Sequence, residues 1–174
     1  QAGGSGDPEV SRALTFPDID RTGFLMVIGG NPAVSRMSFI QLPDPMTRLG
    51  AIVARGGRLV FVNPRHIESA KAAGEHVFIR PDSDVYFLLA FLHEILQRDA
   101  VDHERVRAHM TGFERLADVV RDWTPEKQAE VTGITAATLR ELVSAYLAAD
   151  GAALYASTGV NQGRNGTLAF WALE

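Results

Sequence analysis

The sequence predicts an α/β fold, in which a parallel β-sheet carries helices on both faces and the layers stack as α/β/α. Two observations support this prediction. Four short apolar runs recur along the chain, and they are uninterrupted, as strands buried on both faces of a parallel sheet are. Segments with helical spacing lie between the runs, and strands that alternate with helices form right-handed βαβ units. The expected spatial order of the strands is third, second, first, fourth.

Each apolar run is followed within two residues by glycine, proline or asparagine, which mark the ends of strands. The four runs are Phe24 to Ile28, Arg58 to Val62, His76 to Ile79 and Ala152 to Ser157. Between them, Met46 to Arg55 forms one expected helix, and Ser83, Thr124 and Thr135 stand where further helices begin. The stretch 99–135 carries only helical patterns, so we expect a helical insert there.

Length and composition indicate one globular domain over residues 21–174, preceded by a flexible lead over residues 1–20. The formal net charge of −4 argues against a nucleic-acid partner, and no apolar run is long enough to predict membrane insertion. The chain has no cysteine, which excludes disulfides, thiolate catalysis and iron–sulfur ligands within these residues. Small polar residues at the start and an apolar NGTLAFWALE stretch at the end suggest an excerpt of a longer protein.

Polar residues gather after the apolar runs, and ligands of open parallel sheets bind at the carboxyl ends of the strands. They are Asn31, Ser35 and Arg36 after the first run, Asn63 and Arg65 after the second, Arg80, Asp82, Ser83 and Asp84 after the third, and Gly159, Asn161, Gln162, Arg164 and Asn165 after the fourth. Arginines beside exposed backbone N–H groups suit a phosphate or pyrophosphate. Asp84, at a helix start, could accept from the N–H groups of a base such as guanine.

A structural interpretation of the same residues stays open. Arg65 and Arg80 could form ion pairs with Asp82 and Asp84, and Asp84 could serve only its helix dipole. Familiar nucleotide motifs are missing, since the chain contains neither G-x-G-x-x-G after its first run nor G-x-x-x-x-G-K-[ST]. The second run ends at Asn63, where NAD-binding folds carry an acid. The histidines show no H-E-x-x-H spacing, so no metal site is expected from these side chains.

The order of motifs resembles that of the molybdopterin oxidoreductases of the dimethyl-sulfoxide-reductase family, which includes formate dehydrogenases and nitrate reductases. The motifs, between about Phe24 and Trp171, are GGNPAVS, GGRLVFVNPRHIESA, HVFIRPDSD, TGFERL, WTPE, VTGITAATLREL and GVNQGRNGT. The resemblance implies a Rossmann-like domain that binds molybdopterin guanine dinucleotide. The implied cofactor contacts are Asn31, Ser35, Asn63, Arg65, Arg80, Asp84, Gly159 and Gln162.

The same resemblance implies a role within a larger enzyme. The molybdenum ligand, and an iron–sulfur cluster if the longer chain holds one, would lie outside these residues. No catalytic or metal-ligating residue is therefore assigned, and the 174-residue chain by itself is expected to be inactive. The implied partners are the cofactor, the remaining domains of the longer chain and an electron-transfer subunit.

Three features depart from the family pattern. Asn63 stands where the family usually has aspartate, Asp82 stands where it usually has glycine, and the segment 38–44 is atypical. An alternative interpretation is a non-catalytic nucleotide- or coenzyme-binding module. Examples are the central domain of thiamine-diphosphate enzymes and the cofactor-free relatives of this family in respiratory complexes.

Overall fold

The computed structural model describes residues 17–174, and its strands form one parallel sheet of the order β3-β2-β1-β4. The strands are β1 (Phe24–Ile28), β2 (Arg58–Asn63), β3 (Glu75–Phe78) and β4 (Ala152–Ala156). In the register, Phe24 of β1 lies opposite Arg58 of β2 on one side and Ala152 of β4 on the other. This arrangement confirms the α/β class and the expected strand order.

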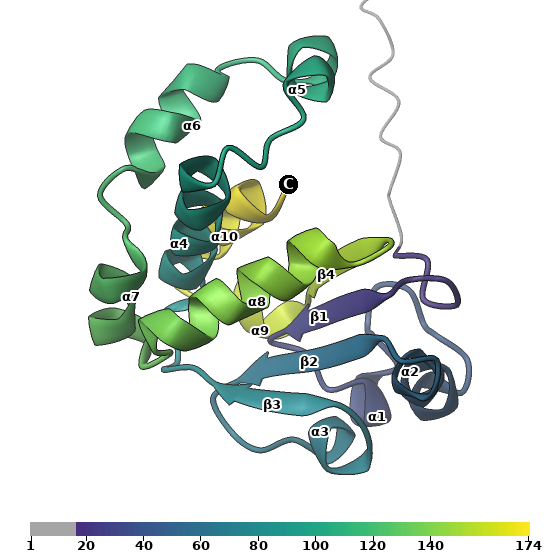
Figure 1. The fold of residues 1–174 in the computed structure, drawn as a ribbon. Helices are drawn as coiled ribbons and strands as arrows, with labels where there is room; N and C mark the ends of the chain where they lie inside the picture. The colour runs from purple at the N-terminus through teal and green to yellow at the C-terminus, as the bar shows by residue number, and fades with distance from the viewer. Residues whose placement is uncertain (1–16) are drawn as a thin grey trace, which may run out of the picture.

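Helices cover both faces of the sheet (Figure 1). One face is covered by α1 (Pro32–Ser35), α2 (Pro45–Ala54) and α3 (Glu68–Ala72). The other is covered by α4 (Asp84–Gln97), α8 (Ala136–Ala148), α9 (Thr158–Asn161) and α10 (Gly166–Leu173). The insert between residues 99 and 135 contains α5 (His103–His109), α6 (Phe113–Val120) and α7 (Pro125–Thr132). Among the insert helices, α7 packs against both α4 and α8.

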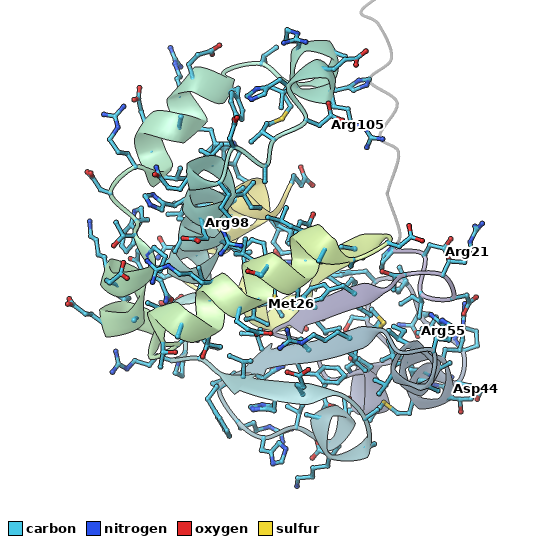
Figure 2. All side chains as sticks on the ribbon, in the orientation of Figure 1. Arg21, Met26, Asp44, Arg55, Arg98 and Arg105 are labelled. Atoms are coloured by element: carbon cyan, nitrogen blue, oxygen red, sulfur yellow. The ribbon has the colours of Figure 1, made fainter. Side chains whose placement is uncertain are left out.

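The two faces of the sheet build two separate apolar cores, because successive side chains of a strand point to opposite sides. Phe24 and Met26 of β1 pack toward α4 and α8, whereas Leu25 and Val27 pack toward α2. All four side chains are fully buried. Figure 2 shows Met26 inside the packed interior and Arg21 and Arg105 at the periphery. The central strands therefore form a rigid platform for the loops at their carboxyl ends.

The third strand differs from the sequence prediction in its burial. Strand β3 runs from Glu75 to Phe78, one residue earlier than expected, and both of its end residues are exposed. The side chain of Phe78 is 60% exposed. The expectation that this strand is buried on both faces is wrong, because β3 lies at the sheet edge, where it pairs with β2 alone.

The expected helix starts lie where they were placed, although one of them uses a different contact. Thr124 and Thr135 cap α7 and α8 by accepting from the backbone N–H groups of Lys127 and Thr138. Ser83 is the residue before α4, but its hydroxyl donates to the carbonyl of Arg80 at 2.6 Å. This serine therefore closes the turn that precedes α4, and its side chain does not cap the helix.

The predicted lead over residues 1–20 overlaps the described part of the chain. Residues 1–16 lie outside the described residues. Ile19 is only 3% exposed and belongs to the core on the α2 face. The folded domain thus includes residues that the sequence interpretation assigned to the lead. Within residues 17–174, no helix has both the length and the apolarity to cross a membrane.

Candidate nucleotide-binding site

The carboxyl edge of the sheet has its switch point between β1 and β4, whose following helices pack on opposite faces. Here two glycine backbones meet, and the N–H of Gly159 donates to the carbonyl of Gly29 at 3.0 Å. A Cβ at Gly159 would lie 2.6 Å from that carbonyl oxygen, and Gly29 has a φ of +63°. The crossing therefore requires glycine at both positions, and it leaves backbone without side chains at the place where α/β sheets bind ligands.

Asn31 joins the loop after β1 to the helix after β2. Its amide nitrogen donates to Glu68 at 2.6 Å, and its amide oxygen accepts from the Ser69 hydroxyl at 2.7 Å. The Ser69 hydroxyl in turn accepts from the backbone N–H of Ala33 at 2.9 Å, and Ser69 is fully buried. Ser35 closes the same turn by donating to the carbonyl of Asn31 at 3.1 Å. These bonds hold α1 and α3 side by side.

Glu68 is a residue that the sequence interpretation missed. Its carboxylate pairs with Arg65 at 3.2 Å and also accepts from Asn31, so it contacts two of the predicted site residues. Its own backbone N–H, followed by Arg65 and Asn31, lowers the pKa of Glu68 to about 2. The spacing of three residues between Arg65 and Glu68 was the signal that could have revealed this pair. A phosphate that binds Arg65 would have to compete with this carboxylate.

Asn63, at the end of β2, is buried to 7% exposure and points toward the loop after β1. Its amide nitrogen donates to the carbonyl of Gly30 at 3.1 Å. An aspartate at this position would be unable to donate to a carbonyl and would place a charge in a buried setting. The amide therefore has a structural role that a carboxylate could not fill, and its oxygen remains available as an acceptor.

We expect Asn63→Asp to lower the free energy of unfolding by about 1–3 kcal/mol, because the Gly30 carbonyl loses its donor and a charge is buried. Urea unfolding at neutral pH measures the change. Asn161→Asp is the matched control, since Asn161 is exposed and a surface substitution changes stability by less than about 0.5 kcal/mol. Equal stabilities for the two variants would contradict the role assigned to Asn63.

Arg80 lies after β3, and its guanidinium binds the end of a helix of the insert. Its Nη1 donates to the carbonyls of Glu130 and Val131, the latter at 3.1 Å. Its backbone N–H donates to the carbonyl of Thr132 at 2.8 Å. A cation at the carboxyl end of a helix is favourable because the last carbonyls lack partners within the helix. The structure thus pairs neither Arg65 nor Arg80 with Asp82 or Asp84, which was one part of the structural alternative; the other part, that Asp84 serves only the dipole of α4, stays open.

Asp84 begins α4 and is half-buried. Burial raises the pKa of its carboxyl, and the nearby Asp82 adds to this, whereas its own backbone N–H acts in the opposite direction. Within residues 17–174, no side chain donates a hydrogen bond to this carboxylate, so it retains acceptor capacity. A ligand with a pair of N–H donors would replace the hydrogen bonds to water that this carboxylate loses on burial.

The eight predicted site residues lie at the carboxyl ends of the strands and in the loops and helix starts that follow them, in two groups. Asn31, Ser35, Asn63 and Arg65 lie near α1 and α3, whereas Arg80, Asp84, Gly159 and Gln162 lie near α4 and α9. Gln162 is exposed and follows α9 directly. Their contacts with a cofactor stay predictions. In the part of the chain that the structure describes, no cluster of three or more histidine or acidic side chains could hold a metal ion.

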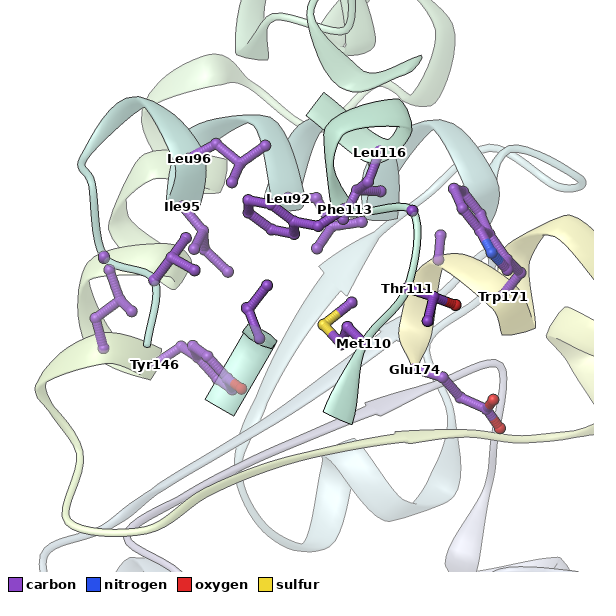
Figure 3. A pocket seen from close by; sticks show the side chains of 16 residues that line it. Leu92, Ile95, Leu96, Met110, Thr111, Phe113, Leu116, Tyr146, Trp171 and Glu174 are labelled. Atoms are coloured by element: carbon purple, nitrogen blue, oxygen red, sulfur yellow. The ribbon is translucent and has the colours of Figure 1, made fainter. Parts of the chain in front are cut away.

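An apolar hollow of about 390 Å³ lies away from this edge (Figure 3). It is lined by the last turns of α4 and α8, by parts of α5 and α6 and by the end of α10, including Phe113, Tyr146 and Trp171. Its lining includes no residue of the loops that follow the four strands at their carboxyl ends. Glu174 is the one charged residue in this lining, and no arginine contributes to it. Such a lining does not suit a phosphate.

Comparisons with known proteins show which enzymes the chain is similar to in sequence. Formate dehydrogenase H of Escherichia coli is 30% identical over 159 residues, which are 90% of this chain and 21% of that protein. The assimilatory nitrate reductase of Haloferax mediterranei is 31% identical over 159 residues, with 91% of this chain and 21% of that protein covered. The chain is homologous to one region of the molybdopterin enzymes of the dimethyl-sulfoxide-reductase family. No family model matches it.

The fold of the chain agrees with that of a solved structure. The structure of acetylene hydratase from Pelobacter acetylenicus superposes with a TM-score of 0.78 at 23% identity and covers 91% of this chain and 21% of that chain. The Rossmann-like fold expected from the sequence is thereby confirmed. The chain spans about a fifth of the length of the curated relatives named above.

Proposed function

We propose that this chain is the domain that binds molybdopterin guanine dinucleotide in a molybdenum oxidoreductase, with the nucleotide at the carboxyl edge of the sheet. The observation that carries the proposal is the glycine crossing of Gly29 and Gly159 at the switch point. A Cβ on either residue would clash with the backbone of the other loop, so the crossing presents backbone without side chains where parallel sheets bind ligands. Homology to formate dehydrogenase and nitrate reductase supports the oxidoreductase part of the proposal.

The residues present fit a guanosine nucleotide. The half-buried Asp84 carboxylate has acceptor capacity for the N–H groups of guanine, and the amide oxygen of Asn63 can accept from a ribose hydroxyl. Arg65 supplies a guanidinium for a phosphate once its ion pair with Glu68 is broken by the ligand. Arg80 holds α7 through its guanidinium, so its role at the site is to place the turn before Asp84.

When bound, the cofactor would supply the two-electron chemistry, and this domain would bind and orient it. The metal ligand and the electron-transfer partners would come from the remaining domains and subunits of the enzyme. The 174-residue chain by itself, which contains no cysteine, is expected to show no redox activity.

Titration of the chain with GDP, followed by NMR chemical shifts, tests the proposal. We expect a dissociation constant near 1 mM, about −4 kcal/mol, because one domain supplies part of the contacts. ADP should bind more weakly, since adenine lacks the N1–H and the 2-amino group of guanine, which form the pair of donors that Asp84 would accept from.

Arg65→Ala should weaken GDP binding about tenfold, because a charge-assisted hydrogen bond to a phosphate is lost. Arg107→Ala is the matched control, because Arg107 is an exposed arginine on α5, in the helical insert. Equal affinities for GDP and ADP, or equal effects of the two arginine variants, would count against the proposed site.

A further inference from the structure

Asp82 adopts an uncommon backbone conformation in the turn between β3 and α4. Its φ is +61°, in the left-handed region, where aspartate is tolerated better than most residues other than glycine. The turn is closed on its other side by Ser83, whose hydroxyl donates to the Arg80 carbonyl. In this conformation the Asp82 side chain makes a hydrogen bond to the loop that contains Arg164.

The carboxylate of Asp82 reaches a loop that is distant in sequence. It accepts from the backbone N–H of Arg164 at 2.7 Å, in the short connection between α9 and α10. A charge-assisted bond of this kind is about twice as strong as one between neutral groups. It joins the turn after β3 to the loop after β4, although these strands lie at opposite edges of the sheet.

Gly163 allows this close approach. A Cβ at this position would lie 2.6 Å from the carboxylate oxygen of Asp82, which is closer than real contacts permit. The loop therefore lies directly on the carboxylate, and the neighbouring residue Gln162 is held next to this contact. Helices α10 and α4 pack against each other beside it, so both partners of the contact rest on fixed elements.

We propose that Asp82 is a positioning residue that holds the loop from Gly159 to Asn165, and with it Gln162, in the conformation that binds the guanosine nucleotide. This inference rests on the proposed function. A loop that is ordered before the ligand arrives loses less conformational entropy on binding, so affinity rises without a new contact. Asp82 itself need not contact the nucleotide, because it acts through the Arg164 backbone.

Two substitutions separate the position of the loop from the charge of Asp82. Asp82→Asn retains a side-chain oxygen that can accept from Arg164 and tolerates the left-handed conformation, but it removes the charge. Asp82→Gly tolerates the same φ and removes the acceptor. The measurements are solvent exchange of the Arg164 amide by NMR, affinity for GDP, and the effect of Gln162→Ala in each background.

In Asp82→Gly we expect the Arg164 amide to exchange at least tenfold faster and GDP to bind about tenfold more weakly. Gln162→Ala should then have little further effect. Asp82→Asn keeps an acceptor but makes a weaker neutral bond, so its effects in all three measurements should have the same direction as those of Asp82→Gly and be clearly smaller. Tighter GDP binding in both Asp82 variants would overturn the proposal, because Asp82 would then act through its charge. A lower melting temperature with unchanged affinity would also overturn it, because the contact would be structural alone.

The proposed function can fail separately. If the wild-type chain shows no shift changes with GDP, the nucleotide site is wrong. The rate of solvent exchange of the Arg164 amide then tests whether Asp82 fixes the loop. Equal exchange rates in wild type and Asp82→Gly would show that it does not.

Discussion

Replacing Gly159 with alanine should lower the free energy of unfolding by about 1–3 kcal/mol, because the new methyl group overpacks a backbone crossing. The Cβ would lie 2.6 Å from the Gly29 carbonyl oxygen and 2.9 Å from the Gly29 Cα, and neither atom belongs to a flexible side chain. The loops after β1 and β4 must therefore separate. We expect the variant to lose GDP binding as well as stability.

Gly50→Ala provides the control for this substitution. Gly50 lies inside α2, and nothing lies within 4 Å of a Cβ built there. Alanine is favoured over glycine in a helix interior by up to about 1 kcal/mol, so this variant should be slightly more stable. Urea unfolding of both variants, with GDP titration of each, measures the two effects. A Gly159→Ala variant as stable as wild type would show that the crossing has room for a side chain.

Asp84→Asn should weaken GDP binding by a factor of about 10 to 150, because hydrogen bonds to a charged acceptor contribute about 1.5–3 kcal/mol. The substitution keeps the shape of the side chain and removes its charge. The same variant should be more stable than wild type without ligand at neutral pH. Burial raises the pKa of Asp84 above 3.8, so in wild type the folded state is destabilised once the carboxyl ionises.

The pH dependence separates this effect from a general change in packing. Well below pH 3.8 the carboxyl is protonated in both the folded and the unfolded state, so the stabilising effect of Asn should be absent. It should develop as the pH rises from 3.8 through the raised pKa and then stay constant. Thermal unfolding at several pH values measures it. A variant that is less stable than wild type at neutral pH would show that the ionised carboxylate is satisfied in the folded protein.

The second strand and its loop show how sequence and tertiary structure share the site. The apolar run ending at Val62 and the following Asn63 correctly placed the carboxyl end of β2. The sequence did not indicate that the Asn63 amide donates to Gly30, since that bond spans 33 positions. Likewise the spacing of Arg65 and Glu68 was visible, but their shared contact with Asn31 depends on how α1 and α3 pack.

The sequence by itself determined the α/β class, the order of the strands and the edge at which polar residues gather. These depend on apolar periodicity and on chain handedness, which are local consequences of backbone geometry. The tertiary structure alone decided that Phe78 is exposed, that Arg80 binds the end of α7 and that Asp82 holds Arg164. Hydrogen-bond partners and burial depend on which loops lie next to each other in space, and that proximity is a property of the whole packed fold.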